Sequence, residues 1–467
     1  MHAVSATSAA ADHDTFLRQP HRTMVRLALP VMFALITEPV TGLVDTAFVA
    51  RLGSEALAAL GVGAIVLSSL FWIFNFLAIG TQTEVARSRG AGELECGREA
   101  AGLALVLAAV IGLGLAVLGL FAAEPAAGAM GAHDEVHGAA SAYLSIRLFG
   151  APAVLVTITA FGALRGLQDM RTPLWIAIGV NAFNIGLDPL LIFGAGPLPA
   201  LGVEGAAWAS VVAQWMGGLA AFVALRSRLG LPARVRLSGP RGVGALLTVG
   251  GDLFLRTGML TGFLLLMTRT ATQIGPEAGA AHQAVRQVWL LSALVLDAFA
   301  HTAQSLVGTF HGAGRQPAMR RVAQVATWWS LGAGVALAAG MLLSESLFAE
   351  ALVPAGAVAA FAWPWRVSAL SQPVNALSFA TDGLHWGTGD YRYLRNAMAV
   401  ATLVGGLGLA WVDPRAPHAL VWVWSISALW ITLRAGLGLI RIWPGLGASP
   451  FDARAEPALA SVAGEGK

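Results

Sequence analysis

The chain has 467 residues, of which 56% are hydrophobic and 12% are charged, and its mean hydropathy is +0.69. Roughly a quarter of the residues in soluble domains are charged, so this composition excludes an ordinary soluble protein and indicates a membrane protein. The isoelectric point near 9.6 does not indicate nucleic-acid binding, because the basic residues are distributed between apolar runs and form no basic patch. The single cysteine, Cys96, excludes an internal disulfide framework.

Apolar runs separated by helix-breaking residues predict twelve membrane-spanning helices, six in each half of the chain. Several of these runs contain no charged residue and are long enough to cross a hydrocarbon core of about 30 Å. The predicted spans are 26–50, 56–83, 100–123, 142–164, 173–194, 204–225, 242–268, 278–308, 322–344, 354–381, 394–412 and 418–440. An even number of spans gives both halves the same orientation. We therefore expect an all-α polytopic membrane protein with two six-helix bundles related by a pseudo-two-fold axis along the membrane normal.

The distribution of basic residues predicts the orientation of these spans. The loops on one side hold 21 Arg and Lys residues, whereas the opposite loops hold three. Cytoplasmic loops carry the excess of such residues, so both termini are expected in the cytoplasm, with the chain in the bacterial inner membrane. The expected divisions are an N-terminal arm (1–25), a first lobe (26–225), a linker (226–241), a second lobe (242–443) and a cytoplasmic tail (444–467), of which residues 445–467 are expected to be disordered.

Two segments of the chain repeat each other. Residues 52–92 and 274–314 align without a gap, with twelve identical positions. Matches between Ala or Gly carry little weight in this composition, but Gln82 matches Gln304 and Asn75 matches Asp297. A duplicated unit in a hydrophobic protein is typical of transporters with two matched halves.

Acidic residues at membrane depth mark candidate functional positions. A charged side chain at the centre of a spanning helix costs about 2.5–3.5 kcal/mol on insertion scales. Six acidic residues lie within or near the ends of the predicted spans: Glu38, Asp45, Asp188, Asp252, Asp297 and Asp382.

Two predicted helices each carry a polar face. In the span 26–50, Glu38 and Asp45 lie on nearly one face, with Thr41 between them. The span 173–194 carries two amides and a carboxylate on one face: Asn181, Asn184 and Asp188. Carboxylate and amide oxygens from two helices suit a site for Na⁺ or H⁺. The alternative is that these groups only hydrogen bond between helices.

The second half offers weaker candidates. Asp252 precedes Arg256 by one helical turn, which favours an internally neutralised ion pair. Asp297, His301 and Gln304 share one helix face, whereas Asp382 is near a helix end, where hydration is an alternative to function. The secondary site candidates are Glu38, Thr41, Asn181, Asp297, Gln304 and Asp382.

Five segments together resemble the multidrug and toxic compound extrusion (MATE) family, and within it the DinF-like branch. They span nearly the entire chain and are TEPVTGLVDTAFVARLG (37–53), GALRGLQDMRTPLWIAIGVNAFNIGLDPLLIFG (162–194), LGVEGAAWAS (201–210), AAHQAVRQVWLLSALVLDAFAHTAQSLVG (280–308) and ATDGLHWGTGDYRYLRNAM (380–398). A loop motif within them also repeats, because Gly166, Asp169 and Arg171 match Gly387, Asp390 and Arg392.

The resemblance implies two six-helix lobes around a central cavity and export of amphipathic, often cationic compounds, driven by H⁺ or Na⁺. A first-helix Asp and a fifth-helix Asn-xxx-Asp form the cation site of this branch, and these fall on Asp45, Asn184 and Asp188. The chain departs from the family at the sixth-helix hydroxyl of some members, because that position falls near Ala206 and Ala207, with Ser210 one turn beyond.

These observations favour a secondary antiporter that works by alternating access. We expect H⁺ rather than Na⁺ as the coupling ion, no cofactor and no metal beyond a possible Na⁺ at Asp45, Asn184 and Asp188. The expected partners are small amphipathic molecules and membrane lipids, with no nucleic acid, and the chain is expected to act as a monomer.

Two other functions remain as alternatives. A lipid-linked sugar flippase of the same superfamily must bind an anionic diphosphate, for which the candidate arginines at membrane depth are few: Arg147, Arg256, Arg286, Arg366 and Arg434. A membrane-embedded enzyme is more remote, because no His/Asp or Cys/His constellation lies in a loop where a catalyst would meet water. We therefore expect no catalytic residues.

Overall fold

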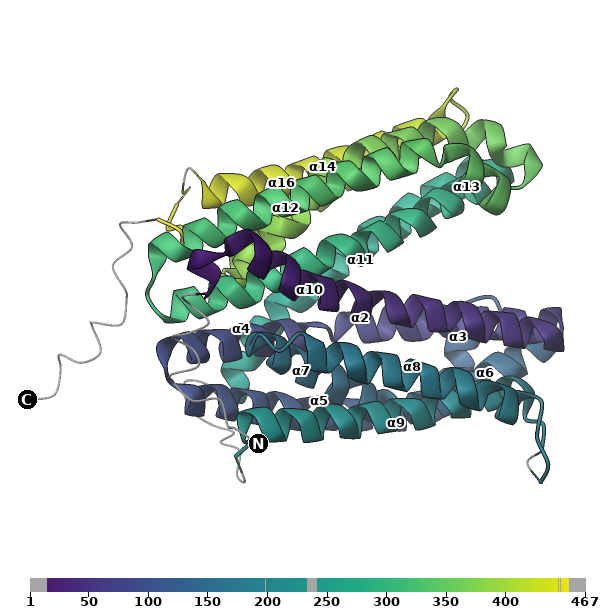
Figure 1. Cartoon of the computed structure of the whole chain (residues 1–467). Coiled ribbons are helices and arrows are strands. Elements are labelled where there is room, and N and C mark those ends of the chain that lie inside the picture. Colours follow the sequence, from purple (N-terminus) through teal and green to yellow (C-terminus); the bar gives the residue numbers. More distant parts are fainter. Residues whose placement is uncertain (1–14, 198, 233–241, 444, 446, 453–467) are drawn as a thin grey trace, which may run out of the picture. The chain divides into compact units, whose positions relative to one another are not determined.

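The computed structural model describes residues 15–197, 199–232, 242–443, 445 and 447–452, and this part of the chain is almost entirely helical (Figure 1). The helices of the first half are α2 (Pro20–Val49), α3 (Ser54–Ile73), α4 (Phe76–Ala91), α5 (Leu94–Ala129), α6 (Asp134–Leu148), α7 (Ala151–Gly166), α8 (Arg171–Ile192) and α9 (Gly202–Leu229). Those of the second half are α10 (Val243–Ile274), α11 (Pro276–Gly312), α12 (Gln316–Leu343), α13 (Glu345–Leu352), α14 (Val358–Thr388), α15 (Tyr391–Ala410) and α16 (Ala419–Ile442).

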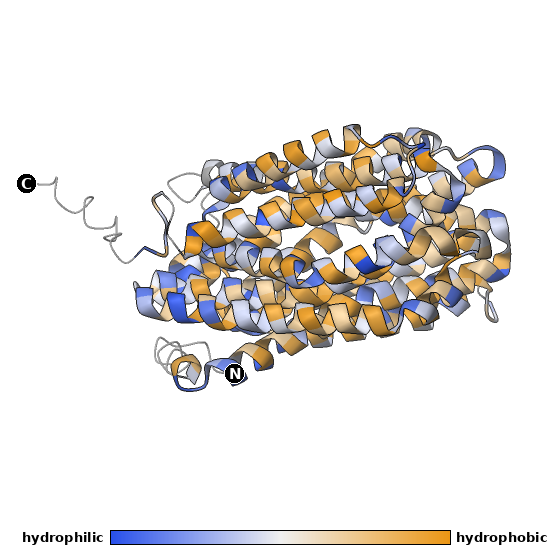
Figure 2. Cartoon of the chain, turned by 90° about the horizontal axis from the view of Figure 1, so that it is seen from above, coloured by the Kyte–Doolittle hydropathy of each residue, from blue (hydrophilic) through white to orange (hydrophobic). Residues whose placement is uncertain are grey.

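The long helices follow the twelve predicted spans when α3 with α4, and α6 with α7, are each counted as one. Within the described residues, nine helices are long and apolar enough to cross a membrane, or ten with the bent pair α6 and α7. The two remaining spans, α14 and α15, contain more polar residues. Hydrophobic residues predominate along most of the long helices (Figure 2).

The chain forms two compact units. One unit contains Leu29–Gly250, and the other contains Gly251–Lys467 together with the beginning of α2 up to Ala28. Each is described by itself below. The first unit buries an apolar core between α3, α5, α6, α8 and α9, and the core of the second lies between α10, α11, α14, α15 and α16.

Both units contain the same close helix crossing. In the first unit, a Cβ atom at Gly162 of α7 would overlap the backbone carbonyl of Ala78 on α4. In the second unit, a Cβ atom at Gly383 of α14 would overlap the carbonyl of Ala300 on α11. Ala78 and Ala300 are matched positions of the sequence repeat, so the repeat extends to the packing of the helices.

The repeated loop motif also has the same role in both units. The carboxylate of Asp169 accepts hydrogen bonds from the backbone N–H and the hydroxyl of Thr172 (3.1 and 2.7 Å) and lies 3.4 Å from Arg228 at the end of α9. The carboxylate of Asp390 accepts a hydrogen bond of 2.9 Å from Arg441 at the end of α16. Each loop aspartate therefore links the loop to the last long helix of its own unit.

Two spans of the first half were predicted to be continuous helices, and in this respect the prediction is wrong. The span 56–83 is interrupted at Phe74 and Asn75, and the span 142–164 is bent by 50° between α6 and α7. The matching helices α11 and α14 are unbroken. Proline alone does not explain the bend at α7, because α14 continues through both Pro364 and Pro373.

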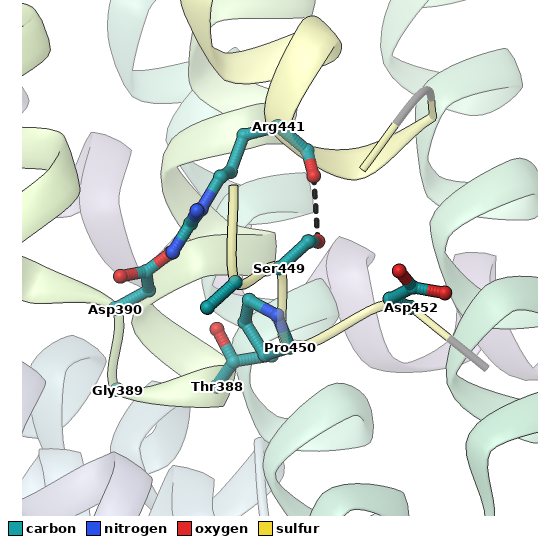
Figure 3. Close-up of a pocket in the computed structure, with 8 residues that line it drawn as sticks. Thr388, Gly389, Asp390, Arg441, Ser449, Pro450 and Asp452 are labelled. Carbon is teal, nitrogen blue, oxygen red and sulfur yellow. Dashed lines mark hydrogen bonds and ion pairs between the residues drawn. The ribbon is translucent and has the colours of Figure 1, made fainter. Parts of the chain in front are cut away.

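The expectation of a disordered tail is wrong for the residues at its beginning. Phe451 is fully buried in the second unit, and its carbonyl accepts a hydrogen bond of 2.8 Å from Arg320. Ser449 and Pro450 line a pocket of about 440 Å³ beside the pair Asp390–Arg441 (Figure 3). Residues 1–14 of the expected arm, 233–241 of the linker and 453–467 of the tail lie outside the described residues.

Candidate functional site

The acidic residues expected on two helices of the first unit come together. The carboxyl groups of Asp45 on α2 and Asp188 on α8 are near enough to interact electrostatically. Asp188 is fully buried, Asp45 is partly buried, and Asn184, one turn before Asp188, is 4% exposed. Glu38, about two turns before Asp45 on α2, is exposed. The residues predicted to bind a cation therefore come from α2 and α8 and lie near one another.

The carboxyl pair lacks hydrogen-bond donors. One oxygen of Asp45, Oδ1, and both carboxyl oxygens of Asp188 are buried without a donor. Two ionised carboxylates in contact repel each other, and a buried oxygen without a donor is costly. A proton shared between the two groups, or a cation bound between them, would remove both penalties.

Sequence reasoning missed the arginine that completes this cluster. Arg147, in the last turn of α6, interacts electrostatically with Glu38, Asp45 and Asp188. Its charge and membrane depth were visible in the sequence, but its position beside α2 and α8 was not.

Other predicted ligands are less well placed. Thr41 is 7% exposed, and its hydroxyl donates a 3.0 Å hydrogen bond to the carbonyl of Thr37, one turn earlier on α2. Asn181 is partly buried, and Nδ2 of Asn184 has no hydrogen-bond partner. On α9, the positions near the expected hydroxyl are the buried alanines Ala206 and Ala207, followed by Ser210 at 8% exposure. The residues able to hold Na⁺ are thus Asp45, Asn184 and Asp188.

The second unit contains a different cluster, and the predicted pairing of Arg256 with Asp252 is wrong. Arg256 of α10 and Arg434 of α16 both bind the same carboxyl oxygen of Asp382 on α14, Arg434 at 2.9 Å. Asp252 instead pairs with Arg395 of α15 at 2.5 Å. The helices cross close enough for long arginine side chains to reach neighbouring helices, so interhelical pairs replace the local one.

Asp297 and Gln304, the remaining candidates in the second unit, have separate surroundings. The carboxylate of Asp297 lies 3.5 Å from Nε2 of His301 on the same helix face. Gln304 is fully buried where α14 crosses α11, and a Cβ atom at Gly387 would lie 2.8 Å from its backbone oxygen. This crossing matches that of Gly166 over the backbone of Gln82 in the first unit, which makes the preserved glutamines part of the helix packing.

Comparison with known protein families decides the identity of this two-unit fold. The MatE family model matches residues 30–190 and 254–412, one segment in each half of the chain. The chain belongs to the MATE family. The sequence repeat and the repeated helix crossings are thus features of a MATE protein.

Curated relatives and solved structures agree with this assignment. The chain is 31% identical to Protein DETOXIFICATION 44, chloroplastic, of Arabidopsis thaliana over 90% of this chain and 81% of the relative. It is 30% identical to DNA damage-inducible protein F of Escherichia coli strain K12 over 92% of this chain and 93% of the relative. Its fold is similar to that of an outward-facing multidrug resistance MATE family transporter of the MOP superfamily, with a TM-score of 0.83, 21% identity and coverage of 90% and 94%.

The comparisons confirm the resemblance to the DinF-like branch and the twelve-helix fold class. The chain is a multi-pass membrane protein and a MATE efflux transporter, not an enzyme. The flippase and enzyme alternatives are accordingly set aside.

Proposed function

We propose that the chain is a proton-coupled antiporter and that Asp45, Asn184 and Asp188 form its coupling site. The observation that carries this proposal is the electrostatic interaction between the carboxyl groups of Asp45 and Asp188, whose buried oxygens lack donors. A proton that enters from one side of the membrane bridges the pair, and its release on the other side completes one half of an exchange cycle. Inward movement of one positive charge is favoured by about 2.3 kcal/mol per 100 mV of membrane potential.

The number of oxygen ligands favours H⁺ over Na⁺. Arg147 places a fixed positive charge beside Asp45 and Asp188, and this charge opposes the binding of either ion. Na⁺ also requires several oxygen ligands, whereas α9 contributes alanines at the nearest expected position. A shared proton requires only the two carboxyl groups.

The exported compounds are proposed to be small, amphipathic and often cationic, moved by a monomer in contact with membrane lipids. Exchange requires two conformations that differ in their affinity for proton and substrate. The proposed lobes are residues 26–225 and 242–443, joined by the linker 226–241. No cofactor takes part.

Replacement of the carboxyl pair tests this mechanism in proteoliposomes with H⁺ and Na⁺ gradients imposed separately. Asp45→Asn and Asp188→Asn keep the shape of the side chain but remove titration, so each variant should insert normally and lose gradient-driven export. Asn184→Ala should weaken export less, because a proton site does not need the amide; a complete loss would favour Na⁺.

The control is Asp413→Asn, which makes the same chemical change in an exposed loop and should leave export unchanged. If Asp45→Asn, expressed at normal levels, exports with unchanged rate and pH dependence, the proposed coupling site is wrong. Asp297 and Asp382 would then be the next candidates.

We also propose that both termini face the cytoplasm of a bacterium whose inner membrane holds the protein. The support is the excess of arginine in the loops of one side, which hold 21 basic residues against three. Cysteines introduced into the linker 226–241 should react with membrane-impermeant reagents only after the cells are opened. Labelling in intact cells would contradict this orientation.

A further inference from the structure

One cluster of the second unit buries two arginines against a single acid. The side chains of Arg256, Asp382 and Arg434 are 6%, 7% and 5% exposed, and the two guanidinium groups share one carboxylate. The charged groups that act on Arg434 are Asp382 and Arg256. A buried charge without a counter-charge is unfavourable, so the cluster has an electrostatic requirement for one further negative group.

The two arginines also retain unused hydrogen-bond donors. Each binds Oδ2 of Asp382 through Nη2, whereas Nε of both Arg256 and Arg434 is buried without a partner. A guanidinium group binds a carboxylate through two parallel N–H donors. The unused Nε atoms therefore offer donors for an additional carboxylate, which Asp252 on the same helix as Arg256 does not provide, because it pairs with Arg395.

One aromatic ring lies against each of the two guanidinium groups. Arg256 lies 5.3 Å from the ring centre of Trp386, and Arg434 lies 4.5 Å from that of Trp430. The stacked rings hold the guanidinium planes and present apolar surface next to the charge. Such a combination fits a ligand that has both an apolar body and an anionic group.

We propose that Arg256 and Arg434 form a binding site for the carboxylate group of an amphipathic substrate. Its use in transport rests on the proposed antiport, because the nearly buried arginines need the helices around them to move before a ligand enters. Binding itself does not depend on coupling. The substrate class is thereby narrowed to amphipathic compounds that carry a carboxylate, including those that also carry a cationic group.

The test measures binding of 2-naphthoate to the purified full-length chain in detergent, by calorimetry and by the shift in melting temperature. The wild-type protein should bind 2-naphthoate more tightly than the neutral 2-naphthamide. Arg434→Gln should weaken 2-naphthoate binding by about ten- to a hundredfold, since a charged hydrogen-bond donor is lost. The variant should melt no lower than the wild type, because Arg256 and Asp382 then form a neutral pair.

The matched control is Arg366→Gln, which removes an arginine of the same unit that binds Glu345 at 2.9 Å, and it should leave 2-naphthoate binding unchanged. Equal affinity for acid and amide, unaltered binding in Arg434→Gln, or binding of chloride without 2-naphthoate would each overturn the proposal. A lower melting temperature of Arg434→Gln would also contradict it, because Arg434 would then have a structural role. Asp45→Asn separates the two proposals, since it should abolish export but retain 2-naphthoate binding.

Discussion

The two units share helix crossings but hold polar clusters of opposite composition. In the first unit, three acidic residues surround the single arginine Arg147. In the second unit, two arginines share the single acid Asp382. The glycines at the crossings are repeated, whereas the charged residues of the two clusters are not. The duplicated fold therefore keeps its helix packing, and its two halves differ at the buried charged positions.

The difference extends to helix continuity. Arg147 lies in the last turn of α6, immediately before the 50° bend into α7, whereas Asp382 lies within the continuous helix α14. At a bend the regular helical hydrogen bonds are interrupted, so the angle between the two helix segments can change there. The charged cluster of the first unit thus lies next to a bend, whereas the shared acid of the second cluster lies within a continuous helix.

The largest effect on stability is expected from the loss of the acid in the second cluster. Asp382→Asn leaves two buried guanidinium groups without a counter-charge and should cost about 3–5 kcal/mol. Asp252→Asn should cost about 1 kcal/mol or less, because the side chain of Arg395 is 32% exposed and retains Asn396 as a partner. Melting in detergent compares the two variants.

Adding Arg434→Gln to Asp382→Asn should restore part of the melting temperature, since it removes one of the unbalanced charges. Equal losses from Asp382→Asn and Asp252→Asn would mean that the cluster of Asp382 is well hydrated and that the contrast between the units is smaller than the structure indicates.

A smaller effect should be the same in both units. Gly162→Ala and Gly383→Ala each introduce a methyl group against a backbone carbonyl of the crossing helix, and each should cost about 1–3 kcal/mol. Gly179→Ala in α8 and Gly332→Ala in α12 are the controls, because a Cβ atom there has no neighbour within 4 Å. A large loss at only one crossing would show that the repeated packing is not energetically equivalent.

The sequence predicted features that depend on local patterns. Apolar runs predicted the spans, and helical spacing correctly placed Asp188 on the polar face of α8, one turn after Asn184. Contacts that depend on how separate helices pack together were not predictable from these local patterns. Arg147 reaches the acids only because α6 packs beside them, and Arg256 prefers Asp382 on another helix to Asp252 on its own. The sequence also did not predict the interruption at Asn75, because the run 56–83 contains no charged residue and no Gly or Pro stands beside Asn75.

The smallest expected effect tests whether the arginine of the first cluster limits the binding of Na⁺. Arg147→Gln leaves Glu38, Asp45 and Asp188 without their fixed positive charge, so Na⁺ should be better tolerated at the carboxyl pair. We expect Na⁺ affinity to rise by about tenfold, equivalent to roughly 1.4 kcal/mol. Export driven by a Na⁺ gradient alone, at constant pH on both sides, is the measurement, and Arg51→Gln at an exposed position is the control. If Arg147→Gln gains no response to Na⁺, the arginine does not limit Na⁺ binding, and the lack of oxygen ligands on α9 becomes the better explanation. A gain that persists in Arg147→Gln combined with Asp188→Asn would place the Na⁺ site away from the carboxyl pair.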